Sequence, residues 1–193
     1  DGGETLELPR PGLVGEHQVE NAGLAVMAAR ALGALAPRPE AIARGLREAS
    51  WPARLQTLAR GPLAGAMPPG SALWLDGGHN PGAGEALART LAARPDFRPL
   101  HLVIGMLSNK DARGFLDPLV GHVASLQAVP IGEHLSHAPE TIVATARELG
   151  MPASAAATPL AAIRSIAAQA TGPVRVLVCG SLYLAGTVLA ENG

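Results

Sequence analysis

The chain has 193 residues, of which 48% are hydrophobic and 16% charged, and its formal net charge is −1. This composition can bury a core, while the absence of lysine or arginine blocks disfavours a nucleic-acid groove or an anionic membrane surface. Cys179 is the only cysteine, which excludes an internal disulfide framework and a cysteine-based zinc site, and no apolar run is long enough to span a bilayer.

The first part of the chain predicts a small helical region. Residues 4–8 alternate polar and apolar side chains, as an edge strand does. Apolar residues recur at helical spacing over 21–35, and Pro39 suits the first position of a second helix over 39–49. Because the chain opens with Asp1 rather than methionine, we expect it to be cut from the middle of something larger. The single cysteine and the lack of a long apolar run or signal peptide lead us to expect a reducing, cytoplasmic setting.

A break in the helical pattern follows at Trp51 and Pro52, since proline prevents a helix from continuing. We place a domain boundary there, with one part over 1–53 and the other over 54–193.

The second part alternates short strands with helices. A probable strand over 55–59 is followed by residues 61–71, whose glycines and prolines predict an exposed loop. The expected strands after it are 72–76, 100–105, 122–129, 153–157 and 174–179, and the expected helices are 83–93, 111–120, 139–149, 160–170 and 182–191. This alternation predicts βαβ units, hence an α/β fold with a mainly parallel sheet.

The most informative loop is Asp76-Gly77-Gly78-His79-Asn80, which follows the apolar strand that begins at residue 72. Open α/β sheets present their chemistry at the carboxyl ends of strands, and this loop brings an acid and a titratable base to that position. The alternative interpretation is an ordinary turn, in which Asp76 caps the following helix and His79 is a surface residue.

Two further polar loops are expected at the same edge of the sheet, because the carboxyl ends of parallel strands cluster. Ser181 and the free amides of the next helix could hold a carboxylate or phosphate, or Ser181 could simply cap that helix. Lys110 could add positive charge beside an anionic ligand, although Lys110 and Asp111 could equally form a solvated pair.

Two residues outside these loops are candidates for nucleotide contacts. Arg54, which follows a rigid Trp-Pro, could bind a phosphate with its two-pronged guanidinium or be a surface arginine. Asn21 could hydrogen-bond an adenine edge or cap its helix. Four histidines have no partner at metal-ligand spacing, so we predict no metal site here: His101, His122, His134 and His137. Neither G-x-G-x-x-G nor G-x-x-x-x-G-K-[ST] occurs. If a nucleotide binds here, most of the contacts to its phosphates must therefore come from outside this chain.

Five ordered motifs extend over nearly the whole chain. They are Gly15-Glu16-His17-Gln18-x-x-Asn21-Ala22, Trp51-Pro52-Ala53-Arg54-Leu55-Gln56, Asp76-Gly77-Gly78-His79-Asn80-Pro81, Gly105-Met106-Leu107-x-x-Lys110-Asp111 and Gly180-Ser181-Leu182-Tyr183. Together they resemble folylpolyglutamate synthase, including the bifunctional dihydrofolate synthase form, in the Mur ligase superfamily.

The resemblance implies a Rossmann-like carboxyl-terminal domain, with helices on both faces of its sheet, in an ATP-dependent ligase. Such an enzyme phosphorylates a carboxylate of folate or dihydropteroate, and the amine of L-glutamate then displaces the phosphate. The implied ATP contacts are Asn21, Arg54 and Asp76, the implied glutamate contacts are His79 and Ser181, and Asn80, Lys110 and Asp111 are supporting candidates.

Some of the family pattern is changed or missing. The family usually has glycine at position 53 and alanine at 78, and we expect these small-for-small changes to matter little. Its P-loop, its magnesium ligands and its modified lysine lie in an amino-terminal ATPase domain that nothing here matches. We therefore expect residues 1–53 to be the tail of the central ATP-binding domain, and the chain alone not to catalyse ligation. The competing hypotheses are a non-catalytic Mur-type module that binds a nucleotide or an amino acid and, disfavoured without a glycine fingerprint, a Rossmann-type oxidoreductase.

Overall fold

The computed structural model describes residues 5–93, 96–132 and 135–192. The chain divides into two compact units, Asp1–Pro52 and Ala53–Gly193, which are described separately below.

The first unit is helical. Its elements are α1 (Glu16–Arg30), the short 3₁₀ turn η1 (Gly33–Leu35) and α2 (Pro39–Glu48). Residues 5–8 form no strand, so the predicted edge strand is wrong; the described part of this unit offers no second strand with which they could pair. The extended segment is instead tied to α2, where Gly12 N donates to Leu46 O at 2.8 Å.

The apolar spacing that predicted the first helix marks a face that this unit leaves exposed. Leu24 and Met27 in α1 are 67% and 71% exposed. Among the described residues of the unit, only Gln18 and Ile42 are buried. The unit therefore has almost no core of its own, because its main apolar stripe has nothing packed on it within the unit.

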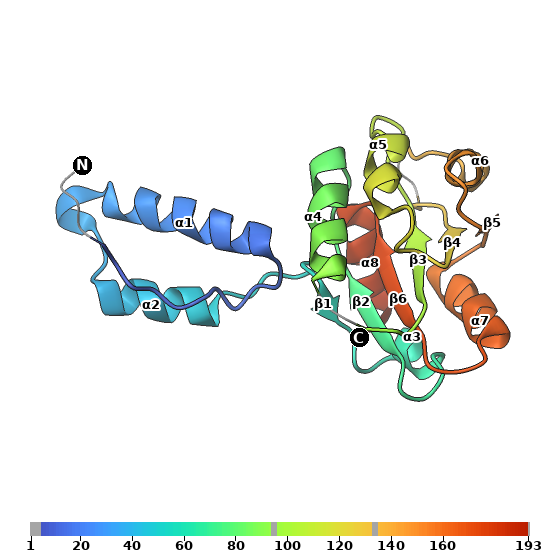
Figure 1. The fold of residues 1–193 in the computed structure, drawn as a ribbon, viewed down its shortest axis with the longest axis horizontal. Coiled ribbons are helices and arrows are strands. Elements are labelled where there is room, and N and C mark those ends of the chain that lie inside the picture. Colours follow the sequence, from blue (N-terminus) through green and yellow to red (C-terminus); the bar gives the residue numbers. More distant parts are fainter. Residues whose placement is uncertain (1–4, 94–95, 133–134, 193) are drawn as a thin grey trace. The chain divides into compact units, whose positions relative to one another are not determined.

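The second unit is built on a six-stranded sheet with the order β1-β2-β6-β3-β4-β5 (Figure 1). The strands are β1 (Gln56–Thr57), β2 (Ala72–Leu75), β3 (Leu100–Ile104), β4 (Ser125–Ala128), β5 (Ala153–Ala155) and β6 (Arg175–Cys179). Only β1 is antiparallel, to β2, whereas every other neighbouring pair is parallel. The predicted α/β fold with a mainly parallel sheet is confirmed.

Helices lie on both faces of this sheet (Figure 1). The helices of the unit are α3 (Pro62–Gly65), α4 (Pro81–Ala92), α5 (Ala112–Leu116), η2 (Asp117–Leu119), α6 (Pro139–Glu148), α7 (Pro159–Gln169) and α8 (Leu182–Asn192). In one layer α4 contacts α5 and α5 contacts α6, whereas α3 contacts both α7 and α8 in the other. The chain changes layers because β6 returns to the middle of the sheet, between β2 and β3, and right-handed crossovers then put α7 opposite α4.

The core follows the alternation of side chains along the strands. Leu73, Val103 and Val176 belong to one buried cluster, which they share with Ile163 of α7 and Val188 of α8. The intervening strand residues, such as Leu102 and Leu177, are also fully buried, and by alternation they point to the opposite layer. Burial on both faces explains the continuous apolar runs in these strands.

The segment predicted as an exposed loop over 61–71 is partly ordered and buried, so that prediction is wrong in part. Pro62 begins α3, and Leu63 is only 2% exposed within the core. Leu63 N donates to Asn192 Oδ1 at 3.2 Å, and Asn192 Nδ2 donates to Arg60 O at 2.6 Å. The contact with the end of α8 provides the order that the glycines and prolines of this segment do not suggest.

Candidate functional site

The loop between β2 and α4 is fixed by a cap at the start of the helix. Asn80 is the N-cap of α4, and its Oδ1 accepts from Ala83 N at 2.9 Å. Pro81 takes the first helical position, where its missing N–H costs nothing. The alternative in which Asp76 caps this helix is therefore wrong.

The Asp76 carboxylate instead accepts hydrogen bonds from the backbone of two separate segments. The residue is 7% exposed. Its Oδ2 accepts from Leu55 N at 2.8 Å, and its Oδ1 accepts from Gly78 N at 2.7 Å. One carboxylate thus ties the segment that carries Arg54 to the glycine loop that carries His79.

The segment held by Asp76 has a strained backbone. Ala53 and Leu55 have φ values of 54° and 44°, in the left-handed region that costs an L-residue about 1–2 kcal/mol. Ala53 N donates to Gln56 Oε1 at 2.9 Å and Gly77 N donates to Ala53 O at 2.9 Å, so several bonds fix the turn. The alanine that replaces the family's glycine at 53 is therefore not a neutral change, because this backbone conformation favours glycine. Arg54 is half-buried, and its Nη1 donates to Ala53 O at 3.1 Å.

The turn from β6 into α8 requires a glycine. Gly180 has a φ of 98°, and a Cβ on it would lie 2.6 Å from Gly105 O. Gly180 N donates to Gly78 O at 2.9 Å, which draws the turn against the β2 loop. Ser181 follows, 2% exposed, and its Oγ accepts from Tyr183 N at 3.0 Å. The helix-capping interpretation of Ser181 is therefore confirmed, and its hydroxyl hydrogen remains available as a donor.

The loop after β3 places Lys110. Lys110 N donates to Leu107 O at 3.0 Å, which forms a turn at this position. The Lys110 side chain is half-buried. His137 Nε2 donates to Lys110 O at 2.9 Å, since a carbonyl oxygen only accepts. Asp111 caps α5, with its Oδ1 accepting from Gly114 N at 2.9 Å, so it does not form a simple solvated pair with Lys110.

These three turns surround a pocket of about 210 Å³. It is lined by His79, Leu107, Lys110, Gly180, Ser181, Leu182 and Tyr183. The loops that were expected to converge do so, because β2, β6 and β3 are neighbours and parallel. His79 Nδ1 donates to Gly77 O at 2.8 Å, which leaves Nε2 as the ring atom for a ligand.

The lining is suited to an anion. It contains the basic side chains Lys110 and His79 and includes the first turn of α8, and the described residues that line it include no aspartate or glutamate. The amino terminus of a helix carries partial positive charge and unpaired N–H groups, which favour a carboxylate or phosphate. Cys179 ends β6 next to this turn, but burial, and secondarily the charge of Asp76, raises the pKa of its thiol, so the thiol is inert.

The other predicted residues lie outside this pocket. Asp76, Asn80 and Asp111 support backbone, and Arg54 is on the strained turn. Asn21 belongs to the first unit, where it is exposed and its Nδ2 donates to Gln18 Oε1 at 3.2 Å.

Sequence reasoning missed His137, which it treated as a surface or core histidine, and gave no role to Tyr183, although the Gly-Ser-x-Tyr spacing was a usable signal. His134 lies outside the described residues. No group of three or more His, Cys, Asp or Glu in the described ranges could hold a metal ion.

A family model described as "Mur ligase, glutamate ligase domain" matches residues 63–182. The chain belongs to this family. Among curated Mur ligase relatives, it is 34% identical over 174 residues to a probable bifunctional folylpolyglutamate synthase/dihydropteroate synthase of Halobacterium salinarum. A protein of the same description from Haloferax volcanii is 35% identical over 186 residues. These alignments cover 89% and 94% of this chain but only 20% of each relative.

Solved structures agree with this assignment. Folylpolyglutamate synthase of Mycobacterium tuberculosis, complexed with ADP and AMPPCP, superimposes with a TM-score of 0.80 at 27% identity, over 97% of this chain and 42% of that one. E. coli FolC in complex with DHPP and ADP gives a TM-score of 0.79 at 30% identity, over 98% of this chain and 42% of that one. The chain thus spans about two fifths of these structures and a fifth of the first curated relatives. None of the described helices is long and apolar enough to cross a membrane.

Proposed function

We propose that this chain is the carboxyl-terminal part of an ATP-dependent carboxylate–amine ligase that adds L-glutamate to folate and, in the bifunctional form, to dihydropteroate. The observation that carries the proposal is the pocket in which Lys110, His79 and Ser181 meet at the first turn of α8. The folylpolyglutamate synthase names of the relatives support the substrate class. The proposed setting is the cytoplasm.

In this proposal the pocket holds the incoming L-glutamate. A carboxylate of glutamate accepts from the Ser181 hydroxyl and the α8 amides, with the ammonium of Lys110 balancing its charge. His79 Nε2 accepts from the glutamate amine when the ring is neutral, or donates to a carboxylate when it is protonated. The oriented amine attacks an acyl phosphate of the acceptor, forms the amide bond and releases phosphate, and the amine's lost proton goes to a base or solvent.

The nucleotide side of the proposal involves Arg54, Asn21 and Asp76. The N–H donors of Arg54 that do not bond Ala53 O pair with ATP phosphates, and the Asn21 amide pairs with the adenine edge. Asp76 contributes by holding the backbone beside Arg54, because both carboxylate oxygens already accept from backbone N–H groups. The relatives solved with ADP and with AMPPNP and Mn support the use of a nucleotide with Mg²⁺. The metal ligands are expected in the amino-terminal ATPase domain of the parent protein, since the described residues offer no cluster for one.

We further propose that residues 1–53 are the tail of that ATP-binding domain and that residues 54–193 form the Rossmann-like domain. The exposed apolar face of α1 supports this assignment, because Leu24 and Met27 have nothing packed on them within their own unit. The chain alone is then half a site, and it is expected to bind glutamate without forming an amide bond.

The test uses both the chain and its full-length parent. L-glutamate titrated into the chain should shift the amide resonances of the 180–183 turn, and adding ATP and folate should give no ligation. In the parent, His79→Ala should raise KM for glutamate about tenfold and KM for ATP much less, as expected for one lost charged hydrogen bond.

His122→Ala, at an exposed histidine outside the pocket, is the matched control and should change neither constant. Ligation by the chain alone, or equal effects of His79→Ala on both KM values, would contradict the proposal. A parent that binds glutamate and ATP but forms no amide bond would favour the non-catalytic module.

A further inference from the structure

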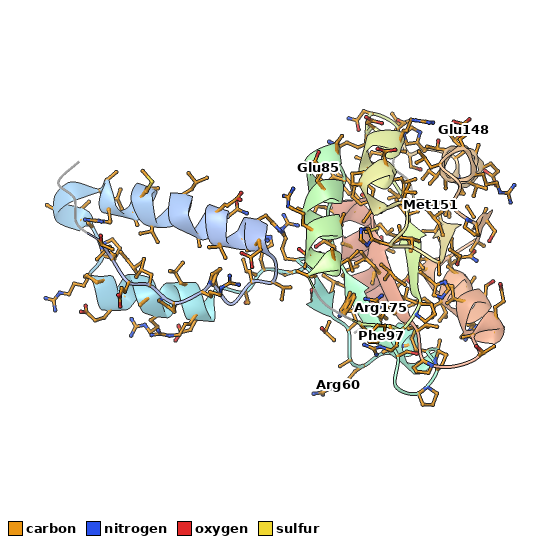
Figure 2. All side chains as sticks on the ribbon, viewed as in Figure 1. Arg60, Glu85, Phe97, Glu148, Met151 and Arg175 are labelled. Atoms are coloured by element: carbon orange, nitrogen blue, oxygen red, sulfur yellow. The ribbon has the colours of Figure 1, made fainter. Side chains whose placement is uncertain are left out.

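A second pocket, of about 330 Å³, lies at the opposite edge of the sheet, where the strands begin. It is lined by Pro99, His101, Ala124, Ser125, Gln127, Ile166, Gln169, Ala170, Thr171, Gly172, Pro173 and Val174. Figure 2 labels Arg175 at this edge, the first residue of β6, whose backbone N donates to Pro99 O at 2.8 Å. The volume of this second pocket is within the range of small-molecule pockets, which begins at about 300 Å³.

The polar part of this lining comes from one face of the sheet. His101 pairs in register with Ser125, and Val103 pairs with Gln127. Val103 belongs to the buried cluster that includes Ile166 of α7. Because side chains two apart on a strand share a face, the imidazole, the hydroxyl and the carboxamide all lie under α7.

Gln127 is the unusual member of this group. The residue is 5% exposed, yet among the residues that the structure describes its carboxamide has no hydrogen-bond partner. Its polar atoms are not among the fully buried side-chain atoms that lack a partner, so the carboxamide reaches the pocket, where water or a ligand can satisfy it. The neighbouring His101 does not satisfy it, because the His101 Nδ1 bond goes to Ser125 Oγ at 2.8 Å.

The pocket is also electrically neutral. Among the described residues, its lining contains no lysine, arginine, aspartate or glutamate. Burial lowers the pKa of His101, so its imidazole is uncharged at neutral pH. Glutamate, ATP and phosphate are charged and therefore match the Lys110 pocket rather than this one. The walls made by Ile166, Pro173 and Val174 suit a flat apolar ring.

We propose that this pocket binds a small neutral molecule with a cis amide edge, a lactam or primary carboxamide, which pairs through two hydrogen bonds with the Gln127 carboxamide. A cis amide presents its N–H and C=O side by side, as the glutamine side chain does, so the ligand amide and the Gln127 carboxamide each donate one hydrogen bond and accept one. An ordinary trans peptide bond cannot make this two-point pairing. The site does not depend on the proposed ligase function.

The test uses 2-pyridone, a flat neutral lactam, and follows the ¹H–¹⁵N spectrum of the 193-residue chain. The side-chain NH₂ of Gln127 and the backbone amides of 171–174 should shift and saturate. N-methyl-2-pyridone has the same ring without the N–H and should bind at least about fivefold more weakly, since it leaves one partner unpaired. Equal binding of the two compounds, or no shift at Gln127 with 2-pyridone, would overturn the proposal.

Gln127→Leu separates a binding role from a structural one. The variant should lose 2-pyridone binding with little change in the melting temperature, because no hydrogen bond among the described residues depends on the Gln127 carboxamide. Gln18→Leu is the matched control: Gln18 is also 5% exposed, but its amide is hydrogen-bonded, and this change should leave 2-pyridone binding intact. A large drop in stability of Gln127→Leu would show that the amide is structural and would refute the assignment.

Discussion

The buried carboxylate of Asp76 gives the sharpest prediction. In Asp76→Asn one of the two oxygens becomes an NH₂ group, so either Leu55 N or Gly78 N faces a donor instead of an acceptor. A hydrogen bond to a charged group contributes about 1.5–3 kcal/mol, and relaxation of the strained turn at Ala53 recovers part of that loss. We expect a net loss of about 2 kcal/mol, or about 7 °C in melting temperature for a unit of about 140 residues.

The assay is urea unfolding of the chain, followed by circular dichroism, beside Asp111→Asn. Asp111 is an exposed N-cap, and asparagine caps a helix as well as aspartate, so that control should lose less than about 0.5 kcal/mol. The reasoning fails if the two variants unfold at the same urea concentration, because burial and double acceptance are what distinguish Asp76.

Two further predictions concern charges and the thiol. A side-chain hydrogen bond from Arg98 is the main reason why the pKa of Asp96 lies well below its usual value, so Asp96 contributes stability above its unfolded pKa and loses it as the pH falls through the folded one. Asp96→Asn should cost about 1 kcal/mol at pH 7 and progressively less below about pH 3.9, measured by urea unfolding, while the exposed Glu85→Gln should cost almost nothing at either pH. Cys179, fully buried in β6, should react with a thiol reagent at least about a hundredfold more slowly in the native chain than in denaturant, and comparable rates would contradict its burial.

The sequence was most informative where local chemistry and global fold agree. Pro81, Pro139 and Pro159 begin helices, and the apolar runs at 100–104 and 175–179 form the buried strands β3 and β6. The convergence of His79, Lys110 and Ser181 was predictable because parallel strands end at one edge. That argument needs only the parallel direction of the strands, which the alternation of strands and helices indicates.

What the sequence did not reveal depends on contacts between distant residues. Leu63 is buried by the far end of α8, which no local pattern around residues 61–71 indicates. The apolar spacing after Asn21 predicted a helix, but it could not say that the helix begins at Glu16 or that its apolar face is exposed. Asp76 was expected to contact ATP because the family resemblance implied it, whereas the orientation of its carboxylate depends on the Leu55 N–H donor, 21 residues earlier.

The position of β6 also governs the order in which the protein can fold. Residues 175–179 fill the gap between β2 and β3, so both of these strands have unpaired inner edges until the ribosome has made nearly the whole domain. Pairings over such long sequence separations form slowly, and open strand edges favour aggregation. A nascent chain that stalls before residue 175 would therefore expose two unpaired strand edges that favour aggregation. We expect this domain to need protection by chaperones late in its synthesis.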